Sequence, residues 1–112
     1  MAKIELKDYV EYGKLVELYG KLLSEDRQKI MSDYFQFNMT LAEIAKERGV
    51  SRQAVLDAID KSCKKLREFE QKLNFMAKQG LLIDELSQIK RLAEEKKIVE
   101  IEEKVEKILK DM

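Results

Sequence analysis

Apolar residues recur along the chain at the three- and four-residue spacing of amphipathic helices. A first helix is predicted from about Asp8, because Asp8 and Glu11 have the spacing of a capping box. Ser24 is suited to cap a second helix, since its side-chain oxygen can accept a hydrogen bond from the backbone of the first turn. The apolar side of this second helix would carry Ile30, Met31, Tyr34 and Phe35.

Two further helices are predicted in the middle of the chain. Thr40 and Glu43 form another capping-box pattern at the start of a short third helix. This helix stops at Gly49, because glycine takes the left-handed backbone conformation that commonly ends helices. Ser51 then caps a long fourth helix, which ends before Gly80.

The last third of the chain contains two more amphipathic stretches beyond Gly80. In the final one, apolar residues repeat at spacings typical of a helical packing seam, at Ile98, Ile101, Val105 and Ile108. This seam either folds back on the long fourth helix or pairs with a second copy of the chain. We therefore predict a helical domain over residues 1–76 and a C-terminal helical extension over residues 77–112.

The composition favours an almost entirely helical chain. None of the 112 residues is proline and only four are glycine, the two residue types that helix interiors tolerate least. The 22 basic and 22 acidic residues balance overall, whereas residues 40–67 hold seven basic and four acidic residues and the rest of the chain is slightly acidic. We predict an all-α fold whose one positively charged segment favours contact with a phosphate backbone.

Residues 40–67 also have the spacing of a helix-turn-helix. Ala45 is small enough for two helices to cross closely, and Gly49 permits the sharp turn four residues later. Apolar side chains of the second helix must then pack against the first, and Val50 and Val55 are placed to contact Leu41. This arrangement would expose the N-terminal part of the second helix, the part that enters the major groove in helix-turn-helix proteins.

The chemistry of that exposed part is mixed. Arg52 could bind a phosphate or a guanine, Gln53 could bind an adenine, and the Ser51 hydroxyl could donate to a phosphate. The predicted nucleic-acid-binding residues are Ser51, Arg52, Gln53, Leu56, Asp57, Lys61 and Lys64. Asp57 and Asp60 would repel phosphates, which predicts modest affinity. The alternative is a pair of packed helices that binds no nucleic acid, with Arg52 solvated or paired with Glu47 or Asp57.

Other kinds of chemistry find little support. The chain has no histidine, the commonest general base and metal ligand. Its single cysteine, Cys63, lies on the apolar side of the long helix and is interpreted as a core residue. No glycine-rich phosphate loop is present, because the four glycines are scattered. We predict no enzymatic activity, no catalytic residue, no metal site and no cofactor.

The sequence also favours a cytoplasmic protein. A single cysteine excludes an intramolecular disulfide and fits a reducing compartment. Residues 1–10 lack the apolar stretch of a signal peptide, and no segment is long and apolar enough to span a membrane. We therefore predict no membrane partner.

One stretch carries a resemblance to known proteins. The segment "LAEIAKERGVSRQAVLD" resembles region 4 of bacterial sigma-70-type factors and, more closely, the small YlxM-like proteins. The resemblance covers about residues 12–75, and "GVSRQAV" is its most specific part. It implies an all-helical fold with a sigma-like helix-turn-helix, and DNA-facing roles for Ser51, Arg52, Gln53, Leu56 and Asp57. Here Leu56 stands where the family often has an aromatic residue, and Asp60 where it often has a basic one.

The resemblance also bears on function. Genes of this family commonly neighbour those of the signal recognition particle's GTPases, which implies a regulatory role in that pathway. We predict a regulatory DNA-binding protein that uses its helix-turn-helix, with DNA favoured over RNA as partner and a homodimer possible through the C-terminal seam. The alternative is a protein-interaction adaptor of the signal recognition particle, in which the helix-turn-helix is only a scaffold.

Overall fold

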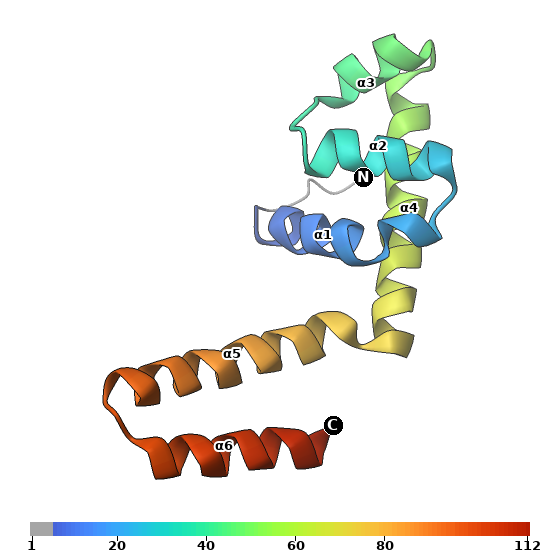
Figure 1. Cartoon of the computed structure of the whole chain (residues 1–112). Coiled ribbons are helices and arrows are strands. Elements are labelled where there is room, and N and C mark those ends of the chain that lie inside the picture. Colours follow the sequence, from blue (N-terminus) through green and yellow to red (C-terminus); the bar gives the residue numbers. More distant parts are fainter. Residues whose placement is uncertain (1–5) are drawn as a thin grey trace. The chain divides into compact units, whose positions relative to one another are not determined.

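The computed structural model describes residues 6–112, with side chains from Asp8 onward. The helices, labelled in Figure 1, are α1 (Leu6–Tyr19), the 3₁₀ turn η1 (Gly20–Leu22), α2 (Glu25–Phe35), α3 (Leu41–Arg48), α4 (Arg52–Leu73), α5 (Phe75–Glu94) and α6 (Ile98–Asp111). No strand occurs in this described part, and the prediction of an all-α fold is confirmed. Residues 1–5, which enter the signal-peptide prediction, lie outside it.

The chain divides into two compact units. The N-terminal unit ends at Met76 and the C-terminal unit comprises Ala77–Met112, so the division falls within α5. In the N-terminal unit, α1, α2 and α3 all pack against the long α4 (Figure 1). The core that they enclose consists of Leu15, Val16, Tyr19, Leu23, Ile30, Met31, Phe35, Ile44, Ala45, Val55, Ala58, Ile59, Cys63 and Leu66.

An aromatic cluster joins α1 to α2 in the same unit. The ring centroids of Tyr9 and Phe35 lie 5.2 Å apart, and Tyr34 meets Phe35 edge-on at 4.9 Å. Tyr19 is fully buried, and its hydroxyl donates to the Glu70 carboxylate over 2.5 Å. Aromatic pairs in these orientations stabilise a fold beyond the area that they bury.

The helix ends follow local chemistry, and several predicted caps are confirmed. The Ser24 hydroxyl accepts a hydrogen bond from the Arg27 amide over 3.3 Å. Thr40 and Glu43 form the complete capping box, with both hydrogen bonds at 3.1 Å. The bond that the Thr40 amide donates to this carboxylate lowers the pKa of Glu43. Gly49 ends α3 with a φ of 68°, in the left-handed region.

Two predicted helix boundaries are wrong. The structure has no capping box at Asp8, because α1 already begins at Leu6 and Asp8 lies in its first turn. The long α4 ends before Gly80, as predicted, but the next helix does not begin beyond Gly80, because α5 begins at Phe75 and continues through it. The break falls instead at Asn74, which takes a left-handed φ of 58°. Asparagine tolerates that conformation, and a single glycine inside a helix costs only about 1 kcal/mol.

The C-terminal unit is a hairpin in which α6 runs back along α5 (Figure 1). The Lys104 ammonium lies 2.8 Å from the Glu85 carboxylate, which joins the two helices. The inner sides of the hairpin carry half-buried residues, at Ile89, Leu92, Ile101 and Ile108. Of the predicted seam, Ile101 and Ile108 thus face inward, whereas Ile98 and Val105 are exposed. No residue of α5 or α6 is fully buried.

Candidate nucleic-acid interface

α3, the turn at Gly49 and α4 form the helix-turn-helix. The Val50 amide donates to the Ala45 carbonyl over 3.0 Å, which closes the last turn of α3. A Cβ added at Gly49 would meet no atom within 4 Å, so glycine is favoured there by its left-handed backbone and not by lack of space. The N-terminus of α4 is fixed by Ser51, whose hydroxyl accepts from the Ala54 amide over 3.0 Å.

Most residues predicted to pack the two helices together do so. Ala45 and Val55 are buried, and Leu41 is partly buried against the core. Val50 is different, because 47% of it is exposed, contrary to the prediction that it packs onto the first helix. It directly follows Gly49 and lies in the turn between α3 and α4, outside both helices.

The exposed start of α4 carries the predicted recognition residues. Ser51, Arg52, Gln53 and Asp57 are exposed, whereas Leu56 is half-buried. The Gln53 amide donates to the Asp57 carboxylate over 2.9 Å, so these two side chains hold each other on the outer face. Among the residues that the structure describes, none forms a hydrogen bond or ion pair with the Arg52 side chain, so its guanidinium can engage a ligand.

Basic residues continue along α4. Lys61, Lys64 and Lys65 are exposed, as is Asp60 among them. Arg67 differs, because its guanidinium donates to the Tyr12 hydroxyl and lies 5.7 Å from the centre of that ring. Lys61 and Lys64 are thus the first two exposed lysines along α4 after its N-terminal turns, whereas Arg67 is held against α1.

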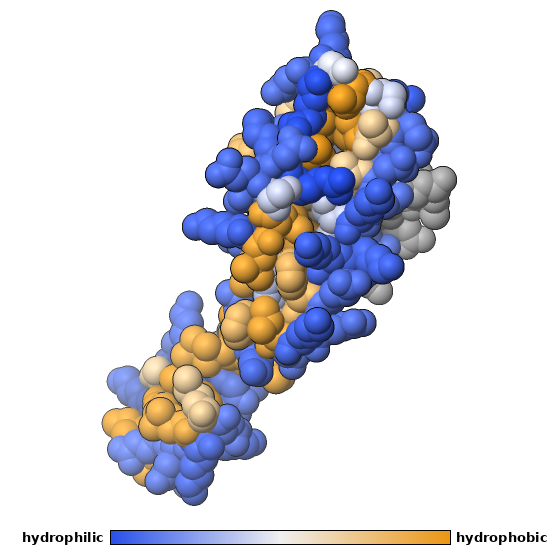
Figure 2. Space-filling view, turned by 90° about the vertical axis from the view of Figure 1, so that its right-hand side faces the viewer, coloured by the Kyte–Doolittle hydropathy of each residue, from blue (hydrophilic) through white to orange (hydrophobic). Residues whose placement is uncertain are grey.

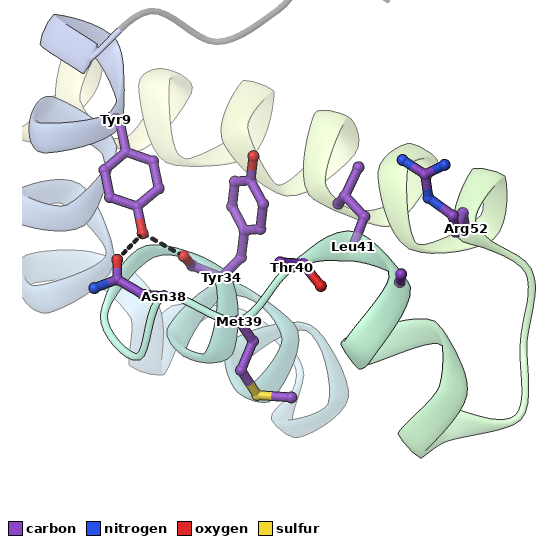
Figure 3. A pocket seen from close by; sticks show the side chains of 8 residues that line it. Tyr9, Tyr34, Asn38, Met39, Thr40, Leu41 and Arg52 are labelled. Carbon is purple, nitrogen blue, oxygen red and sulfur yellow. Dashed lines mark hydrogen bonds between the residues drawn. The ribbon is translucent and has the colours of Figure 1, made fainter.

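A pocket of about 410 Å³ lies beside Arg52, and sequence reasoning missed it. Figure 3 shows Arg52 at one end and the pair Tyr9 and Asn38 at the other, with Tyr34 between. The Tyr9 hydroxyl lies 2.5 Å from the Tyr34 carbonyl oxygen and 2.7 Å from Asn38 Oδ1. Burial is the main cause that raises the pKa of Tyr9. The spacing of apolar residues placed Tyr34 on the apolar side of its helix, but it did not indicate that Tyr34 also lines a pocket.

Cys63 lies in the core as interpreted from the sequence. Its thiol is free and buried. Burial raises the pKa of this thiol to about 12. A thiol with so high a pKa is almost entirely protonated at neutral pH and is a poor nucleophile.

A comparison with models of known protein families identifies the family of this chain. Residues 6–108 match the profile of the family UPF0122, whose description reads "Putative helix-turn-helix protein, YlxM / p13 like". The chain belongs to this YlxM/p13-like family. The resemblance that the sequence suggested is therefore confirmed, and the description of the family names a helix-turn-helix and no enzymatic activity.

Individual members of the family are similar over most of their length. A UPF0122 protein of Fusobacterium nucleatum is 38% identical over 85 residues, which cover 76% of this chain and 82% of that protein. A UPF0122 protein of Clostridium perfringens is 33% identical over 106 residues, covering 93% and 91%. No solved structure matches the chain significantly. None of the described helices has the length and apolar character needed to cross a membrane.

Proposed function

We propose that this YlxM/p13-like protein binds duplex DNA by inserting the N-terminus of α4 into the major groove, and that it acts as a regulator. The observation that carries the proposal is the exposed Arg52 in the first turn of α4, directly after the sharp turn at Gly49. The positive end of the α4 dipole adds to the attraction for a phosphate. A phosphate or a guanine edge is the ligand that a guanidinium at this position would take.

The other predicted nucleic-acid-binding residues would each contribute according to their place on α4. Lys61 and Lys64 would contact phosphates farther along α4, each as an exposed point charge. Gln53 would have to leave its hydrogen bond with Asp57 to bind an adenine, which costs part of the energy of that contact. Asp57 and Asp60 would repel the backbone, so DNA would be held with modest affinity at physiological salt.

The experiment is a fluorescence-anisotropy titration of labelled duplex DNA at several salt concentrations. Arg52→Ala should weaken binding by about 1–3 kcal/mol while helicity and melting stay unchanged. The matched control is Arg91→Ala, which removes the same charge from an exposed position of α5. Wild-type affinity of Arg52→Ala would remove Arg52 from the interface, and equal losses in both variants would mean that only net charge matters.

The same titration separates the two roles of Arg52. If its guanidinium contacts a phosphate, Arg52→Ala should lower the slope of log affinity against log salt by about 1. If it contacts a base, the slope should stay and the preference for one sequence should fall. A structured RNA in a parallel titration tests whether duplex DNA is the preferred partner.

The exposed apolar surface of the C-terminal unit favours a second candidate function, an adaptor of the signal recognition particle. In the part of α5 that belongs to this unit, the exposed large apolar residues are Leu81, Leu82, Ile83 and Leu86. Figure 2 shows apolar side chains at the surface in its lower part. Such a surface is suited to a protein partner. The test is co-sedimentation of the protein with the purified GTPases and RNA of the particle, with Leu82→Glu as the disrupted variant. Failure to retain any component would contradict the adaptor.

A further inference from the structure

A second pocket, of about 350 Å³, lies between the start of α2 and the middle of α4. Its walls are formed by Leu23, Ser24, Arg27, Lys61, Ser62 and Lys65. Every charged residue among them is basic. Three cations around one pocket produce a positive potential that attracts an anion, and low-dielectric walls strengthen it.

The backbone adds to this potential. The pocket includes Ser24, the cap of the 11-residue helix α2, whose positive dipole end lies there. Glu25 and Asp26 follow in the same turn, but neither lines the pocket. Asp26 forms an ion pair with Arg48, which offsets its charge. The two acidic residues that follow Ser24 in the sequence therefore do not compete with an anion for this pocket.

Ser62 supplies the observation that points to a ligand. It is only 3% exposed, and its Oγ has no hydrogen-bond partner among the residues that the structure describes. A serine inside a helix commonly donates to the carbonyl four residues earlier, which here is that of Ala58. The Ala58 carbonyl instead accepts from Arg27 Nη1 over 3.1 Å. A buried hydroxyl without a partner is unfavourable, and a ligand acceptor would relieve it.

The same hydrogen bond orients Arg27. With one N–H engaged by the Ala58 carbonyl, the planar guanidinium keeps further donors in a fixed fork beside Ser62. Lys61 and Lys65 are exposed and flexible, and they can close over a bound group. A fork, a hydroxyl and two ammonium groups match the several acceptor oxygens of a phosphate.

We propose that this pocket binds a phosphate group, carried either by a nucleotide or by a nucleic-acid backbone. Arg27 binds two of its oxygens, the Ser62 hydroxyl donates to one of them, and Lys61 and Lys65 neutralise the charge. Arg52 and Lys65 are thirteen residues apart, so at about 100° per residue their side chains leave α4 in directions about 140° apart. The pocket therefore lies on a different flank of α4 from Arg52. It shares Lys61 with the proposed DNA interface, but the variants that test it change Ser62 and Lys65, so the inference does not rest on major-groove binding.

The test is a titration of isotope-labelled protein with inorganic phosphate at constant ionic strength, followed by backbone amide shifts. The amides of Arg27, Ser62 and Lys65 should shift and saturate together. Ser62→Ala removes the hydroxyl without leaving a void, and Lys65→Ala removes one charge; each should weaken phosphate binding about tenfold. Lys72→Ala is the matched control, since Lys72 lies seven residues beyond Lys65 on the same side of α4 but outside the pocket.

Two further arms identify the source of the phosphate. Adenosine diphosphate that binds more tightly than inorganic phosphate, with the same shifts, assigns the pocket to nucleotides. A short DNA duplex or a structured RNA that displaces phosphate, and loses affinity with Ser62→Ala, assigns it to the backbone. Shifts that do not saturate, or wild-type phosphate affinity in Ser62→Ala and Lys65→Ala, would overturn the proposal. Because Arg52 is intact in these variants, that result would leave major-groove binding untouched.

Discussion

The two units of this protein obtain their stability in different ways. The N-terminal unit encloses a core to which α1, α2, α3 and α4 all contribute, and its helix ends are capped by Ser24, Thr40 and Ser51. The C-terminal unit is equally regular in its secondary structure, yet no residue of its two helices is fully buried. The difference shows that regular amphipathic helices do not by themselves form a core, because a side chain is buried only where several helices cover it from different sides.

The same difference suits the two units to different tasks. A tightly packed unit can hold the start of α4 in a fixed position, which groove recognition requires. A hairpin with half-buried inner residues and exposed leucines is stabilised further when a partner covers its apolar surface. The proposed DNA contact therefore belongs to the N-terminal unit, and protein contact is proposed for the C-terminal unit.

The largest expected effect on stability comes from a substitution that removes a side chain from the N-terminal core. Leu66 is fully buried in α4, so Leu66→Ala should lower the free energy of unfolding by about 2–5 kcal/mol. Leu86 on α5 is 53% exposed, and Leu86→Ala should change it by less than about 0.5 kcal/mol. Urea denaturation followed by circular dichroism measures both. Equal losses would show that Leu86 is covered in solution, by a partner or a second copy.

Replacing one glycine in each unit tests the difference between the units further, with expected effects on stability of intermediate size. Gly49 has a φ of 68°, so Gly49→Ala should cost about 1–2 kcal/mol even though a Cβ would meet no neighbour. Gly80 lies inside α5, also with open space around it, so Gly80→Ala should stabilise that helix by up to about 1 kcal/mol. Thermal unfolding measures the first, and hydrogen exchange of the α5 amides the second. Stabilisation by Gly49→Ala would contradict the left-handed turn.

The last expected effect, which appears only at high pH, concerns the Cys63 thiol in the N-terminal core. Burial raises its pKa to about 12 in the folded protein, whereas an unfolded thiol has its ordinary pKa near 9. Its contribution to stability is therefore complete below about pH 9 and is lost as pH rises from there through about 12. The difference in unfolding free energy between wild type and Cys63→Ala should narrow over this range. A constant difference would mean that the thiol is not shielded from solvent.

How much the sequence could predict depended on the range of the interaction. The caps at Thr40 and Ser51 and the stop at Gly49 rest on residues within a few positions, and local patterns predicted them. The sequence predicted that the long helix ends before Gly80 but not that it ends at Asn74, because both residue types tolerate helix ends and only the surrounding structure decides between them. The exposure of Val50 was missed for a similar reason. The spacing of apolar residues does not show in which direction a side chain in a turn points.

The candidate sites show the same limit. The exposed residues of the α4 N-terminus followed from helical spacing and the family resemblance. The hydrogen bond from Arg27 to the Ala58 carbonyl joins residues 31 positions apart, so no local pattern could indicate it or the serine hydroxyl that it leaves without a partner. The pocket between Arg52 and Tyr9 likewise depends on how α1 and α2 meet α4. Contacts between distant segments become visible only after the helices are packed.

The aromatic cluster of the N-terminal unit has an optical consequence. The chain has no tryptophan, and its four tyrosines are Tyr9, Tyr12, Tyr19 and Tyr34. Residues 77–112 contain no aromatic residue. Ultraviolet emission, and the near-ultraviolet dichroism of fixed rings, therefore come from the N-terminal unit alone, whereas far-ultraviolet dichroism sums over all helices. Two spectra of one unmodified sample can thus distinguish the melting of the packed unit from the fraying of the hairpin, with no label attached.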